Sequence, residues 1–234
     1  ASGCPALSTH PRRSDWRYEA LLMLRAEGIR HRYGSHDVLV LDAFLGARNE
    51  SWLILGQSGS GKTTLLHILA GLIRPSAGKV MINDQDLGAL SGVRLDQFRG
   101  RTIGFVPQQL HLIGSLNVKA NLALARYLAG LPADEARIAR MLRDLGIADK
   151  AAALPAALSH GQAQRVAVAR AVINAPAVLL ADEPTANLDD VHADRTIELL
   201  ETQARAVGAL LVIATHDQRL KRRIANQVVL GAPA

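Results

Sequence analysis

The chain has 234 residues, enough for one large domain or two small ones, and we expect a single compact domain. Aromatic residues make up only 3% of it, which argues against the stacking platforms of single-stranded nucleic-acid binders, and the formal charge of +6 is spread without a long basic block. We therefore expect no nucleic-acid partner. The longest apolar runs, such as residues 208–215, are far shorter than the ~20 residues that a membrane-spanning helix needs.

The first 22 residues differ in character from the rest. They contain Pro5, Pro11 and many small polar residues, without any hydrophobic period. We expect residues 1–22 to be a tail, either disordered or an artefact of an upstream start, and residues 23–234 to form the domain. The only cysteine, Cys4, cannot form an internal disulfide, which fits a reducing cytoplasm.

In chain order, the domain begins with strand-like segments. Residues 23–44 contain short apolar stretches separated by Gly28, Gly34 and His36-Asp37, and they predict β-strands joined by turns. Residues 52–55 form a compact apolar run that stops at a glycine, and residues 62–72 continue with helical spacing. The order is strand, glycine loop, helix.

Strands and helices alternate through the rest of the chain. Further strands are expected at residues 78–83, 102–106, 178–181 and 210–214, and helices at residues 159–175 and 191–206, with two more between 117 and 146. Parallel strands need crossover helices between them, so this alternation predicts an α/β fold with a parallel sheet and a helical insert in mid-chain.

The glycine loop carries the strongest chemical signal. Residues 56–63, Gly-Gln-Ser-Gly-Ser-Gly-Lys-Thr, match the pattern G-x-x-x-x-G-K-[ST] between a strand and a helix. Glycines let the backbone wrap a phosphate and present its N–H groups together with the positive end of the helix. We expect Lys62 to reach the β- and γ-phosphates of ATP and the Thr63 hydroxyl to bind Mg²⁺. A glycine-rich turn capping an ordinary helix is the plainer alternative.

Two adjacent acids follow the apolar strand at residues 178–181. Asp182 and Glu183 stand where open parallel sheets bind ligands, and successive side chains of a strand diverge. We assign Asp182 to the Mg²⁺ shell and Glu183 to polarising the attacking water. Taken alone, the pair could be a solvated acidic turn before Pro184.

A further segment, Leu-Ser-His-Gly-Gln at residues 158–162, precedes an Ala/Val-rich helical stretch. Ser159 suits an N-cap, and Gln162 three residues on completes a capping-box pattern, so the helix would present a free positive N-terminus. With the phosphate loop and the acid pair, this segment resembles the signature of ABC-transporter nucleotide-binding subunits, and the resemblance runs from about residue 23 to 231. His160 departs from it, because the family usually has glycine there.

The resemblance implies a P-loop fold with a RecA-like, mostly parallel sheet, an N-terminal antiparallel β subdomain and an α-helical subdomain at about residues 108–165. It also implies roles for single residues. Gln108 would sense Mg²⁺ and water, His216 would contact the γ-phosphate, Tyr33 would stack on adenine, and Asp189 would lie across a dimer interface or cap the next helix. The nucleotide contacts implied are Tyr33, Gly56, Gln57, Ser58, Gly59, Ser60, Gly61, Lys62, Thr63, Thr64, Ser159, Gly161, Gln162 and Asp189. The catalytic set is Glu183, His216, Gln108 and Lys62, and the metal set is Thr63, Gln108 and Asp182.

The same resemblance implies an ATPase that closes as a head-to-tail homodimer over two ATP molecules and drives an integral membrane permease. Within the family, residues 71–78 and 103–121 most resemble the branch of lipoprotein release, macrolide efflux and cell division. That branch places the chain at the cytoplasmic face of the bacterial inner membrane, as a peripheral subunit. An importer subunit and a nucleotide-controlled scaffold are the alternatives.

Overall fold

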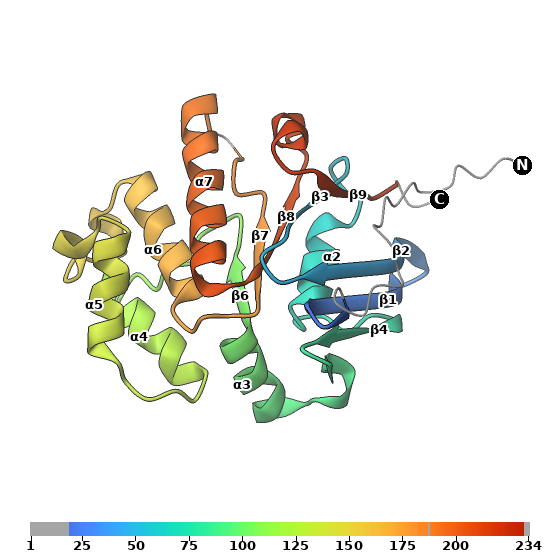
Figure 1. Ribbon diagram of the computed structural model, residues 1–234, viewed down its shortest axis with the longest axis horizontal. Helices are drawn as coiled ribbons and strands as arrows, with labels where there is room; N and C mark the ends of the chain where they lie inside the picture. Colours follow the sequence, from blue (N-terminus) through green and yellow to red (C-terminus); the bar gives the residue numbers. More distant parts are fainter. Residues whose placement is uncertain (1–18, 187, 232–234) are drawn as a thin grey trace, which may run out of the picture.

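The computed structural model describes residues 19–186 and 188–231, and within them the strands form two sheets (Figure 1). The first is antiparallel, in the order β2-β1-β4-β5. Its strands are β1 (Leu22–Tyr33), β2 (His36–Ala47), β4 (Ala77–Ile82) and β5 (Gln85–Asp86). The turn expected at Gly34 joins β1 to β2, but Gly28 lies inside β1, and His36-Asp37 begins β2 instead of forming a turn. The register between β1 and β4 shifts between Glu27 and Arg30 instead, because a bulge takes up the extra residue and keeps Ala26 and Ile29 on the buried face.

The second sheet is parallel, in the order β6-β7-β8-β3-β9. Its strands are β3 (Ser51–Leu55), β6 (Ile103–Val106), β7 (Val178–Asp182), β8 (Leu210–Thr215) and β9 (Asn226–Val229). The residues of β7 and β8 are buried throughout, which explains their unbroken apolar sequence. The order also places the carboxyl ends of β7, β8 and β3 next to one another at one edge.

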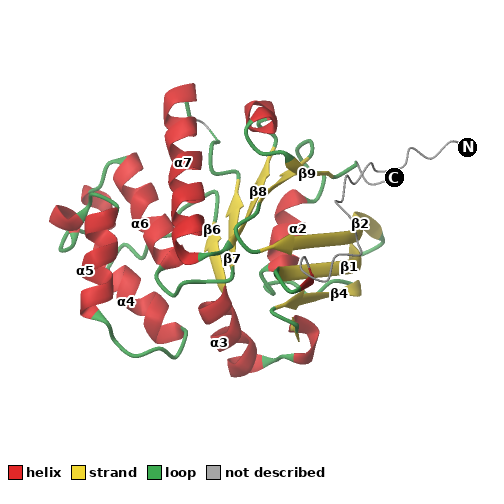
Figure 2. Ribbon diagram, viewed as in Figure 1, coloured by secondary structure: helices red, strands yellow, loops and turns green. Residues whose placement is uncertain are grey.

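Helices cover both faces of the parallel sheet (Figure 2). They are α2 (Lys62–Leu69), α3 (Gly92–Thr102), α4 (Val118–Leu128), α5 (Glu135–Asp144), α6 (His160–Val172) and α7 (Asp190–Val207). Short 3₁₀ turns are η1 (Leu87–Ala89), η2 (Ala148–Lys150), η3 (Pro155–Ala157) and η4 (Gln218–Arg222). No helix of the described residues is long and apolar enough to cross a membrane.

Three hydrophobic cores join these layers. The first joins α2 to both sheets, and it includes Leu66 of α2, Ala26 of β1 and Val212 of β8. The second packs α6 and α7 against the other face of the parallel sheet, and the third joins α4, α5 and α6. Since α2 carries the residues that follow the glycine loop, the first core fixes that loop against the strand edge.

Candidate functional site

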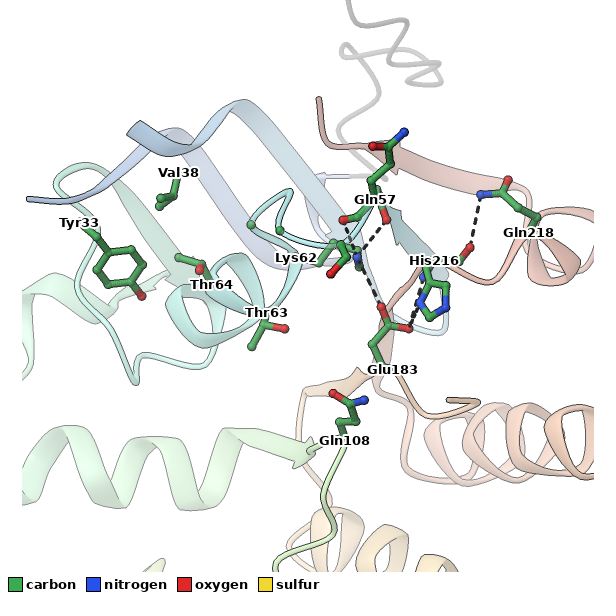
Figure 3. Close-up of a pocket in the computed structure, with 14 residues that line it drawn as sticks. Tyr33, Val38, Gln57, Lys62, Thr63, Thr64, Gln108, Glu183, His216 and Gln218 are labelled. Carbon is green, nitrogen blue, oxygen red and sulfur yellow. Dashed lines mark hydrogen bonds and ion pairs between the residues drawn. The ribbon is translucent and has the colours of Figure 1, made fainter. Parts of the chain in front are cut away.

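The glycine loop lies at the edge where β3, β7 and β8 end, and it lines a cavity of about 770 Å³ (Figure 3). The lining brings together segments that are far apart in the sequence. It consists of Tyr33, Val38, Gly56, Gln57, Ser58, Gly59, Gly61, Lys62, Thr63, Thr64, Gln108, Glu183, His216 and Gln218. Most of the predicted nucleotide contacts therefore share one cavity. Ser60 is buried within the loop, and its hydroxyl is unpaired within the described residues.

The loop backbone has a conformation that only glycine adopts without strain. Gly59 and Gly61 have φ of 80° and 87°, in the left-handed region. Gly61 is the N-cap of α2, and no side chain of the described residues caps this helix end. Its first N–H groups are thus free to bind an anion, and the helix dipole favours one there.

The two glycines differ in the space around them, which gives a test of the loop. A Cβ at Gly61 would lie 2.6 Å from the Val38 carbonyl oxygen, whereas a Cβ at Gly59 meets no atom of the described residues within 4 Å. Gly59→Ala should cost only the left-handed strain of about 1–2 kcal/mol. Gly61→Ala should cost a further 1–3 kcal/mol or so, because the backbone of β2 must move. Urea unfolding of both variants measures the difference, and equal losses would contradict the described contact.

Lys62 is held inside the loop that it follows. Its Nζ donates to the carbonyls of Gly56 (2.9 Å) and Gln57 (3.0 Å) and lies 3.4 Å from Glu183 Oε1. The side chain is only 7% exposed, and a buried ammonium needs such partners. Its positive charge therefore faces the cavity beside a carboxylate (Figure 3).

Glu183 is fixed by the end of the neighbouring strand. Its Oε2 accepts hydrogen bonds from the Thr215 hydroxyl (3.1 Å) and the His216 backbone N–H (3.3 Å), and lies 2.9 Å from His216 Nδ1. Its φ of 44° is left-handed, which is unusual for a residue other than glycine. One carboxylate oxygen thus faces β8 and the other faces Lys62.

Asp182 is the last residue of β7 and is buried. Burial raises the pKa of its carboxyl, and a hydrogen bond from Thr63 acts in the opposite direction. Its Oδ1 has no hydrogen-bond partner within the described residues. A buried, unpaired carboxylate oxygen beside a hydroxyl is a donor set that a hard cation such as Mg²⁺ would satisfy.

Gln108 and Tyr33 complete the cavity from two other elements. Gln108 follows β6, and the loop after it is held by Arg170 of α6, which donates to the carbonyls of Leu110 and His111 (both 2.7 Å). Tyr33 is 52% exposed at the end of β1, and its ring stands nearly perpendicular to the His31 ring at a centroid distance of 4.7 Å. The exposed part of the Tyr33 ring is open to a flat ligand group.

Ser159, Gly161 and Gln162 lie elsewhere, in a cavity of about 750 Å³ between α6 and α7. The predicted capping box is confirmed, since Ser159 Oγ accepts from Gln162 N (3.3 Å) and Gln162 Oε1 accepts from Ser159 N (2.9 Å). Asp189 caps α7 by accepting from His192 N, and it too is absent from the lining of the first cavity. Asn187, two residues before Asp189, is outside the described residues. One copy of the chain does not bring these groups to the phosphate loop.

Several residues with clear structural roles at the site were missed by the sequence analysis. Thr215 and Arg170 are two of them, and Thr185, Asp217 and Arg219 form a hydrogen-bonded group beside Glu183. Of these residues, only Asp217 had a local signal in the sequence, because it directly follows the predicted His216. The partners of the others come from distant segments, which no local pattern reveals.

A glycine loop at a strand end, an uncapped helix, a buried lysine and two adjacent acids at the end of β7 together define a P-loop nucleoside triphosphatase. The family profile described as ABC transporter matches residues 44–186. The lipoprotein-releasing system ATP-binding protein LolD of Shewanella sp. (strain MR-4) is 37% identical over 218 residues, which cover 89% of this chain and 93% of LolD. LolD of Chromohalobacter salexigens is 41% identical over 205 residues, covering 85% and 86%.

A solved structure agrees with this class. The dimeric post-hydrolysis state of the ATP-binding cassette MJ0796, bound to ADP and Pi, superimposes with a TM-score of 0.78 at 31% identity, covering 89% of this chain and 94% of MJ0796. The chain therefore belongs to the ABC transporter family, and it is an ATP-binding and ATP-hydrolysing subunit. The fold class, the ATPase activity and the ATP ligand expected from the sequence are confirmed.

Proposed function

We propose that the chain hydrolyses Mg²⁺-bound ATP in the cavity lined by the glycine loop, with Glu183 as the residue that polarises the attacking water. The observation that carries this proposal is the position of the Glu183 carboxylate, 3.4 Å from Lys62 and 2.9 Å from His216. A carboxylate fixed between two phosphate-binding groups is suited to accept a proton from water as the γ-phosphate is attacked.

The remaining residues have binding roles in this proposal. The loop N–H groups and Lys62 hold the phosphates, His216 contacts the γ-phosphate, and Tyr33 stacks on adenine. Thr63, Asp182 and Gln108 would hold Mg²⁺, which supplies positive charge to the phosphate oxygens when bound. The unpaired Asp182 oxygen supports the metal assignment.

The separate position of Ser159, Gly161 and Gln162 supports a head-to-tail homodimer. The N-terminus of α6 is capped internally and exposed, so it can complete the nucleotide site of a second copy. Two solved structures of the related cassette MJ0796 are dimeric. In this arrangement ATP lies between the two chains, Asp189 lies across the interface, and hydrolysis weakens the contacts that hold the dimer.

We assign the permease contact to a groove of about 540 Å³ between the parallel sheet and the helical region. Leu72, Ile113 and Leu128 line it and are all exposed apolar residues, while Arg99 and Asp96 add charge. Such a groove fits an amphipathic helix on the cytoplasmic side of an integral membrane permease. The LolD relatives belong to lipoprotein-releasing systems, so we propose lipoprotein release at the cytoplasmic face of the bacterial inner membrane.

The experiment uses the permease that co-purifies with the chain from its own membranes, reconstituted in proteoliposomes. Replacing Leu128 and Leu72 with glutamine should weaken permease binding by about tenfold or more, because apolar contacts at the centre of an interface carry most of its affinity. Lipoprotein release should fall in parallel, while the ATPase activity of the free chain stays unchanged. Val40→Gln on β2, an equally exposed apolar site outside the groove, is the control. Equal binding by all variants would contradict the groove assignment, and absence of lipoprotein release by the wild-type complex would contradict the substrate.

A further inference from the structure

The orientation of Glu183 depends on the segment that follows β8. Every hydrogen bond described for Glu183 Oε2 comes from Thr215 or His216. A displacement of this segment would therefore move the carboxylate and the histidine together. The contacts that hold Thr215 and His216 in place therefore also fix the position of the Glu183 carboxylate.

Asp217 is the anchor of that segment. Its backbone N–H donates to Thr215 Oγ1 (3.0 Å), and its Oδ2 accepts from the hydroxyl of Thr185, which follows β7 (3.1 Å). Hydrogen bonds from Arg219 hold the pKa of the Asp217 carboxyl below its usual value. The anchor is thus an ionised, nearly buried carboxylate between the ends of two strands.

Arg219 connects this anchor to α7. Its Nε and Nη2 donate to Asp217 Oδ1 (2.8 Å) and Oδ2 (2.6 Å), and its Nη1 pairs with Asp190. Asp190 is the first residue of α7, next to the capping Asp189. One guanidinium therefore bridges the loop that carries His216 and the helix end that carries Asp189.

Most exposed ion pairs contribute little to folding stability, so a functional role for the Arg219 bridge has to rest on its position. The same region contains a suitable comparison. Arg223, at the end of η4, also pairs with α7, through Glu201 at 2.8 Å. Arg219 and Arg223 are 45% and 31% exposed, yet only Arg219 contacts residues adjacent to His216 and Asp189.

We propose that Arg219 is a positioning residue that couples the His216–Glu183 pair to the start of α7. This rests on the proposed function, in which Asp189 lies across the dimer interface. Dimer closure then acts on the helix end, and the bridge through Asp190 and Asp217 carries that change to the carboxylate that polarises water. The guanidinium suits this task because its planar fork pairs bidentately with Asp217 while a further N–H reaches Asp190, a geometry that a lysine ammonium does not reproduce.

The test compares Arg219→Gln with Arg223→Gln in the full chain, measuring kcat, KM for Mg-ATP, the Hill coefficient and the melting temperature. Arg219→Gln should lower kcat about tenfold, the scale of losing one charge-assisted hydrogen bond, with KM unchanged and the Hill coefficient reduced toward 1. Arg219→Lys should recover only part of kcat. Arg223→Gln should leave all three kinetic quantities unchanged, with a similar loss of melting temperature.

Asp190→Asn provides a second variant that breaks the bridge from its exposed end, and it should reproduce the kinetic change without affecting folding. Combining it with Arg219→Gln should add nothing further, because both remove one connection. If Arg219→Gln behaves like Arg223→Gln, or if Asp190→Asn keeps full kcat and cooperativity, the coupling role is wrong. Absence of ATP turnover in the wild-type chain would instead overturn the proposed assignment of the site.

Discussion

Replacing Glu183 with glutamine is expected to lower ATP turnover by about 10²–10⁴-fold while ATP binding is retained, since that is the usual contribution of a general base. Glutamine keeps the shape of the side chain and can still accept hydrogen bonds from Thr215 and the His216 N–H. It lacks the negative charge that now faces Lys62, so it cannot take a proton from water. Phosphate release and binding of a fluorescent ATP analogue, measured on the same preparation, separate the two effects.

The matched control for this change is Glu201→Gln, which makes the same chemical substitution in the ion pair between α7 and Arg223, away from the cavity. Its turnover should equal that of the wild type. Turnover by Glu183→Gln within tenfold of the wild-type rate would show that another group polarises the water.

Asp182→Asn is expected to remove the effect of Mg²⁺ on ATP affinity, lowering the affinity in the presence of Mg²⁺ by at least about tenfold. The pKa of the Asp182 carboxyl is raised, chiefly by burial. Because its pKa is higher in the folded chain than in the unfolded chain, the protonated carboxyl stabilises the fold at low pH. That contribution is lost as the pH rises through the folded-state pKa. Ionising this buried carboxyl is thus a cost to the metal-free protein, and asparagine should not lower the melting temperature of that form.

Nucleotide binding with Mg²⁺ and with EDTA, together with thermal unfolding without nucleotide, tests both halves of this expectation. Asp194→Asn on the exposed surface of α7 is the control, and its ATP binding should keep the Mg²⁺ dependence of the wild type. An Asp182→Asn chain that still binds ATP more tightly with Mg²⁺ than with EDTA would place the metal on other ligands.

The part of the site that the sequence predicted is the part encoded locally. The glycine loop, its lysine and the paired acids each lie within a few residues of a strand end, and the strand order brings those ends together. The caps at Ser159 and Asp189 were predicted for the same reason, because a cap involves only residues three positions apart.

Features that depend on distant partners were not predicted. The helix α3 was missed because all of its side chains are at least partly exposed, so it has no apolar stripe to signal a helix. Edge strand β9 is short and follows η4 without a glycine, and its pairing with β3 joins residues more than 170 positions apart. The bridge formed by Arg219 is equally non-local, since its carboxylate at Asp190 is 29 positions away in the chain.

Helix α6 has contacts at its two ends that matter together. Ser159 caps its N-terminus, and Arg170, in its last turn, holds the loop after Gln108. A helix of 13 residues is a stiff rod of roughly 20 Å, supported along its length by two hydrophobic cores. Because a stiff helix moves as one body, a displacement of its N-terminus by a second copy is expected to reach the loop that follows Gln108.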